Sequence, residues 1–157
     1  MLAIELVVSS LLFALVVLVI VLALVRRAIR TTTAKARAEL ESEGVVMETP
    51  PVGGSVRYRN FRGRRLGGQM IVASRAIVAV RVVVVLTQQQ LALVGFRTVH
   101  IPRAELGRFV VRAADGRLVL ATDRPLDGTG HVEYHLRVTE PETWVRALVE
   151  AGAAAAA

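Results

Sequence analysis

HVEYHLRV, residues 131–138, alternates apolar and polar side chains without a break. Val132, Tyr134, Leu136 and Val138 occupy every second position, with histidine, glutamate and arginine between them. Successive side chains of a strand point to opposite faces, so this period of two predicts a half-buried β-strand. The stretch therefore assigns its part of the chain to a β-sheet.

Further β-branched runs precede this strand, and turn residues separate them. Asp115-Gly116 is a dipeptide typical of tight hairpins, and Pro102 interrupts the pattern before the run that follows it. Residues 61–68, FRGRRLGG, have the composition of a loop. The remaining runs predict six more strands, at 55–60, 69–74, 77–86, 91–96, 106–111 and 117–122.

One amphipathic helix is expected to follow the last strand. Thr139 to Glu142 reads as a capping box with Pro141 in the first turn, where the missing N–H is not needed. Trp144 and Leu148 then belong to one apolar stripe.

Several short segments resemble bacterial PH-like domains, which have the pleckstrin-homology superfold and occur in small single-pass membrane proteins. The likeness covers about residues 55–151. It implies a seven-stranded, partly open barrel whose C-terminal helix plugs one end, with Trp144 and Leu148 as the plug. It also implies a binding scaffold, not an enzyme, and no phosphoinositide site. The segments that carry it are Val85-Leu86-Thr87, Leu91-Ala92-Leu93, His100-Ile101-Pro102, Leu106 to Val111, and Glu140-Pro141-Glu142-Thr143-Trp144.

The N-terminal run from Leu6 to Val25 carries no charge, and Arg26, Arg27 and Arg30 follow it. Twenty helical residues would rise about 30 Å, the hydrocarbon thickness of a bilayer. The run predicts a transmembrane helix rather than a cleaved signal peptide or a buried core helix. By the positive-inside rule, we expect a plasma-membrane protein with its N-terminus outside and its larger domain in the cytoplasm.

These features together predict an α+β chain, an N-terminal membrane helix followed by a mainly-β domain. The expected order is a short extracytoplasmic N-terminus (1–5), the transmembrane helix (6–25), a juxtamembrane helical stalk with a Pro/Gly linker (26–54), the PH-like domain (55–151) and an alanine-rich tail (152–157).

Charge is distributed unevenly along the 157 residues. The net charge is +7, and residues 49–104 contain nine arginines and no acid, whereas the rest of the domain contains more acids than bases. A basic surface of this kind favours anionic partners. The alternative is that these arginines pair with the acids of the second half. The absence of cysteine agrees with a reducing compartment.

The sequence predicts no catalytic or metal-binding site. His131 and His135 have the i, i+4 spacing of a helical zinc pair, but on a strand they stand about 13 Å apart. With Glu133 between them they read as a solvent-facing row. No G-x-S-x-G turn or P-loop pattern is present. We therefore expect no enzyme activity, no metal and no cofactor.

The arginine-rich segment is the strongest candidate for a binding surface. Tyr58 and Phe61 lie among its basic residues. Guanidinium groups suit carboxylate and phosphate oxygens. We expect a membrane-anchored interaction module that binds a protein partner. The alternative is contact with anionic lipid headgroups, which the predicted anchor favours over nucleic acid. The candidate residues are Arg57, Arg59, Arg62, Arg64 and Arg65.

Overall fold

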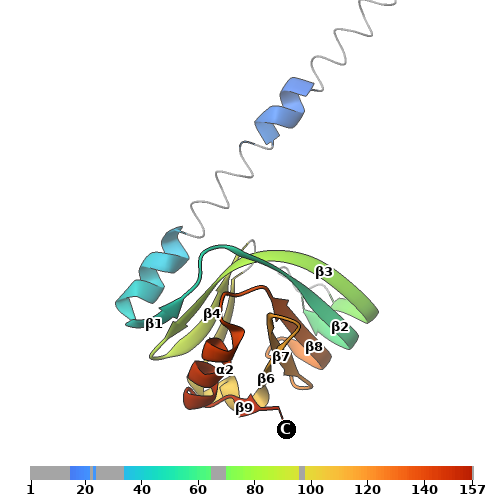
Figure 1. The fold of residues 1–157 in the computed structure, drawn as a ribbon. Helices are drawn as coiled ribbons and strands as arrows, with labels where there is room; N and C mark the ends of the chain where they lie inside the picture. Colours follow the sequence, from blue (N-terminus) through green and yellow to red (C-terminus); the bar gives the residue numbers. More distant parts are fainter. Residues whose placement is uncertain (1–14, 22, 24–33, 65–69, 96–97, 157) are drawn as a thin grey trace, which may run out of the picture.

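The computed structural model describes residues 15–21, 23, 34–64, 70–95 and 98–156, and it contains one nine-stranded sheet. Hydrogen-bonded neighbours follow the order β5-β4-β3-β2-β8-β7-β6-β9, and β1 pairs separately with β3. Neighbouring strands are antiparallel except β6 and β9, which are parallel. The sheet curls into a half-barrel (Figure 1).

The elements have the following bounds: β1 Val45–Glu48, β2 Val52–Arg64, β3 Met70–Thr87, β4 Gln90–Val94, β5 Val99–Pro102, a 3-10 helix η1 Arg103–Arg108, β6 Val110–Ala114, β7 Arg117–Thr122, β8 Gly128–Leu136, α2 Pro141–Glu150 and β9 Ala154–Ala155.

The long strand β3 determines the shape of the sheet. Its first part pairs with β2, and its last residues pair with β1 on one edge and β4 on the other. Two strands were predicted here, at 69–74 and 77–86, but Arg75 and Ala76 continue the pairing with β2 instead of turning. The segment predicted as a loop at 61–68 is likewise strand as far as Arg64. In Figure 1, β2 and β3 arch over the domain.

The predicted fold class is wrong as stated. The described chain is mainly β, with nine strands in one curled sheet rather than a seven-stranded barrel. The physical reason is the incomplete pairing of β3, because β4 pairs only with its residues Val83 to Leu86. Nothing in the described part of the chain closes the remaining edge, so the curl stays half a barrel.

The predicted anchor is also corrected. Most of Leu6–Val25, together with Arg26, Arg27 and Arg30, lies outside the described residues. Within that span, the described residues 15–21 and 23 are helical. No described helix combines the length and apolar character that a bilayer crossing needs. This finding stands against the predicted transmembrane helix and against the plasma-membrane location inferred from it.

Helical residues 34–42 pack onto the sheet. Leu40 is 1% exposed and belongs to a cluster with Val85, Ala92 and Val94. The helical residues end at Ser42, and Gly44 follows with φ of +77°, the left-handed conformation that glycine commonly adopts after a helix.

The main core lies between the concave side of the sheet and α2. Trp144 and Leu148 are buried in it, and α2 packs against β6 and β7. The predicted capping box is wrong, because Glu140 occupies the N-cap in a left-handed conformation and no side chain caps the helix. Pro141 does lie in the first turn.

Candidate functional site

Three polar side chains line one face of β8, opposite the core. Val132 and Leu136 point into the core, and the residues alternating with them are His131, Glu133 and His135. The side chains of these three are 21%, 17% and 11% exposed, respectively. The row predicted to face solvent is therefore largely buried, and its polar groups must find partners within the protein.

Glu133 joins the two histidines. His131 Nε2 lies 3.0 Å from Glu133 Oε1, and His135 Nε2 lies 2.9 Å from Glu133 Oε2. His131 Nδ1 in turn lies 2.6 Å from Asp123 Oδ1. The two histidines lie too far apart along the strand for one metal ion to bridge them. The two carboxylate oxygens of Glu133 span this separation. The result is a continuous chain, Asp123–His131–Glu133–His135.

This chain shifts two pKa values. Burial acts to lower the pKa of His131, but the hydrogen bonds to Glu133 and Asp123 outweigh it, and the pKa is raised above 6.5. Hydrogen bonds from His131 and His135 lower the pKa of Glu133 to about 2, against the opposing effect of burial. Both ring nitrogens of His131 face carboxylates, which favours the protonated imidazolium with two N–H donors.

The bonding pattern leaves His131 without a nucleophile as its partner. Its Nε2, the atom that a catalytic base would offer to a hydroxyl, faces Glu133. Among the described residues, no group of three or more histidine, aspartate or glutamate side chains is arranged to hold a metal ion.

The predicted arginines line the outer face of the neighbouring strand. Arg57, Arg59 and Arg62 on β2 are exposed. Arg57 is the register partner of Glu133, and Arg59 is the partner of His131 on one side and of Arg75 on the other. Arg64 ends β2, and Arg65 lies outside the described residues.

Tyr58 and Phe61 lie on the core side of β2, away from the arginines. Their ring centroids are 5.1 Å apart and tilted by 55°, and Phe61 is buried in a small cluster with Val56 and Val132. They are packing residues and do not offer faces for stacking to a ligand bound at the arginines.

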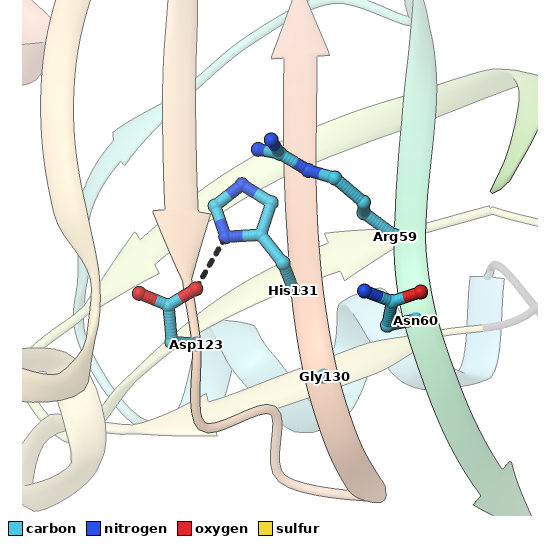
Figure 2. A pocket seen from close by; sticks show the side chains of 5 residues that line it. All are labelled: Arg59, Asn60, Asp123, Gly130 and His131. Atoms are coloured by element: carbon cyan, nitrogen blue, oxygen red, sulfur yellow. Dashed lines mark hydrogen bonds and ion pairs between the residues drawn. The ribbon is translucent and has the colours of Figure 1, made fainter. Parts of the chain in front are cut away.

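A shallow depression of about 480 Å³ lies where β2 and β8 meet, lined by Arg59, Asn60, Asp123, Gly130 and His131 (Figure 2). The pairing of the two strands shifts register between Arg59 and Arg62, and Asn60 there has φ of +50°. This bulge places a cationic side chain beside the Asp123–His131 bond.

The sequence pattern placed His131, Glu133 and His135 on one face but missed their bonding. The i, i+2 spacing on a strand was the available signal, because such side chains are neighbours. Asp123 carries no such signal, since the loop between β7 and β8 brings it to His131.

Comparisons with protein-family models, with curated proteins and with solved structures returned no match. The fold and the site thus define a curled β-sheet domain with an arginine-bearing outer face. The resemblance to PH-like domains stays a prediction.

Proposed function

We propose that this chain is a non-enzymatic interaction module that binds an acidic segment of a protein partner. The binding surface is the outer face of β2, which we call the arginine face and define as Arg57, Arg59 and Arg62. The surface acts through charge and shape, and no bond is made or broken.

The arginine face has no internal counter-ion in the described part of the chain. None of its three members forms an ion pair with a described residue, although each is exposed. The alternative expectation, that acids of the second half neutralise these arginines, receives no support here. The acids that do pair engage other groups: Glu105 contacts Arg108, and Asp123 contacts His131.

The single observation that carries the proposal concerns Glu133. It is the register partner of Arg57 and would be the natural acid to neutralise it. Instead both of its oxygens face histidine nitrogens at 3.0 and 2.9 Å. The histidines thereby keep the nearest carboxylate occupied, and the guanidinium of Arg57 stays available.

Arginine suits this role because its planar guanidinium donates paired hydrogen bonds to a carboxylate. Complementary charge also speeds encounter and excludes basic partners. Binding of this kind should weaken as salt rises, since exposed charges are screened.

The test measures binding of a fluorescein-labelled ten-glutamate peptide to the full chain in mild non-ionic detergent. Anisotropy titrations compare wild type with the double variant Arg57→Ala/Arg59→Ala. We expect the dissociation constant to rise by about tenfold or more, which corresponds to about 1.4 kcal/mol.

A matched control removes the same charge elsewhere. The double variant Arg112→Ala/Arg146→Ala takes two exposed arginines from β6 and α2. Equal weakening by both pairs would mean a general charge effect and would overturn the proposal. A further arm uses vesicles with and without phosphatidylserine. Salt-sensitive binding to the anionic vesicles but not to the peptide would replace the protein partner with lipid headgroups.

A further inference from the structure

The first part of β3 has one open edge. β1 and β2 follow each other along one edge of β3, from Thr87 back to Met70. On the opposite edge β4 pairs only with Val83 to Leu86. No described strand pairs with Met70–Val82 on that side. In Figure 1 this part of β3 forms the outer margin of the arch, with β2 on its inner side.

The direction of the backbone groups on this edge follows from Val84. Its carbonyl accepts the Thr49 N–H at 2.9 Å, and its N–H donates to Thr49 Oγ1 at 2.9 Å, so both groups face the β1 and β2 side. Backbone groups alternate sides along a strand. The N–H and C=O groups of Ile77, Ala79 and Arg81 therefore face the open edge.

An independent contact supports this assignment. A Cβ atom placed on Gly95, the residue after β4, would lie 2.9 Å from the carbonyl oxygen of Arg81. That carbonyl therefore faces the β4 side, as the alternation requires. Beyond it, towards Ala79 and Ile77, no described residue continues the pairing.

The side chains along this edge are apolar and basic. Val72, Ile77 and Val78 are 67%, 65% and 48% exposed. Arg75 and Arg81 are exposed as well, and no described residue forms an ion pair with either. An unpaired edge with exposed apolar side chains is a template for another strand.

We infer that the open edge of β3 binds an acidic, extended segment of a partner protein as an added antiparallel or parallel strand. This inference rests on the proposed function and names its binding mode. Main-chain hydrogen bonds from Ile77, Ala79 and Arg81 would supply affinity, and the arginines beside them would select acidic side chains.

Charge argues against a second copy of this chain as the occupant. Edge-to-edge pairing of two β3 strands would bring Arg75 and Arg81 of both copies together. Residues 49–104 contain no acid to separate them. Like charges opposed across a strand pair are destabilising, whereas glutamates on an added strand would be attracted.

The test uses a ten-residue peptide of alternating glutamate and valine, and a matched peptide with N-methyl groups on its two central residues. The N-methyl groups keep every charge but block hydrogen bonds on both edges of the peptide. We expect the unmodified peptide to bind the full chain and the N-methylated one to bind at least tenfold more weakly. Amide exchange should slow at Ile77, Ala79 and Arg81.

Ala79→Pro tests the same edge from the protein side. It removes the outward N–H and leaves the hydrogen bonds to β2 in place, and proline is tolerated on edge strands. We expect binding to be lost while a thermal melt shows a folded protein. If this variant fails to fold, the N-methylated peptide still decides the question on wild type.

Three results would overturn the inference. Equal binding of both peptides, weakened only by Arg57→Ala/Arg59→Ala, would leave the proposed function standing without strand addition. Absence of binding by either peptide would remove strand addition, and the ten-glutamate titration would then decide separately whether the arginine face binds acidic segments. Sedimentation showing a wild-type dimer that Ala79→Pro dissociates would assign the edge to a second copy.

Discussion

Arg57 and Glu133 are register partners on β2 and β8, yet they form no ion pair, because His131 and His135 occupy the Glu133 carboxylate. A cross-strand pair of opposite charge would ordinarily be a stabilising contact. Here Glu133 stabilises its own strand by bonding to the two histidines, and Arg57 stays exposed at the surface. The stability of β8 and the availability of the arginine face are thus linked through one side chain.

Glu133→Gln should lower stability in a pH-dependent way. The lowered pKa of Glu133 gives stability above its ordinary 4.5 that is lost as pH falls towards about 2. The raised pKa of His131 gives stability below 6.5 that is lost as pH rises through its folded value. The difference between wild type and variant should therefore be largest between about pH 4.5 and 6.5.

Thermal melts across this range would measure the difference. A loss of about 1 kcal/mol would lower the melting temperature by about 4 °C for a domain of this size. Glu150→Gln, on an exposed position of α2, serves as the control. A constant difference from pH 3 to 9 would contradict the role assigned to the histidines.

Asp123→Asn should reduce the pKa of His131. The Asp123 carboxylate contacts Nδ1 at 2.6 Å and helps to hold the proton on the ring. Because the Asp123 side chain is 86% exposed, the effect should shrink as salt rises. Titration of the imidazole resonances by NMR would measure it, with Asp115→Asn in the exposed β6–β7 turn as the control. An unchanged midpoint at low salt would show that Asp123 does not hold the proton.

Trp144→Ala should be among the most destabilising substitutions in the domain. Trp144 is 3% exposed and packs in the main core beneath the sheet. Truncating a buried aromatic side chain costs about 3–5 kcal/mol. Urea unfolding would measure the change in midpoint. Val149→Ala, at a position 38% exposed on the same helix, should cost less than about 1 kcal/mol. Similar costs for both would remove the packing role of Trp144.

The local pattern of apolar and polar residues predicted the strands that have one buried and one more exposed face. Residues 117–122 and the core positions of 131–138 alternate or are fully apolar, and they form β7 and β8. The pattern failed in the middle of β3. Arg75 and Ala76 looked like a break between two strands, but pairing with β2 carries β3 through them.

Hydropathy alone predicted a transmembrane helix at residues 6–25, whereas no described helix is long and apolar enough to cross a membrane. The strand predicted at 106–111 begins only at Val110, and Leu106 is instead buried from the 3-10 helix η1. Only part of the candidate site could be predicted from the sequence. The face shared by Glu133 and its flanking histidines followed from the period of two, but the contact with Asp123 depends on the loop that precedes β8.

Gly130→Ala should destabilise the junction of β2 and β8 beyond the cost of its backbone conformation. Gly130 has φ of +100°, and a Cβ atom there would lie 2.2 Å from the carbonyl oxygen of Asn60. The left-handed conformation alone costs a non-glycine residue about 1–2 kcal/mol. Because the clash involves backbone on both sides, β8 must move away from the bulge in β2. We therefore expect a loss of more than about 2 kcal/mol in urea unfolding.

Gly116→Ala separates the two contributions to that loss. Gly116 also has positive φ, at +67°, but a Cβ atom there meets nothing within 4 Å. Its substitution should therefore show the conformational cost without the clash. The excess at Gly130 measures how closely β2 and β8 must approach to set Arg59 beside His131, and the amide resonances of both residues should shift in Gly130→Ala alone. Equal losses for the two variants would mean that the junction yields freely, and the close approach would then have no part in positioning the arginine face.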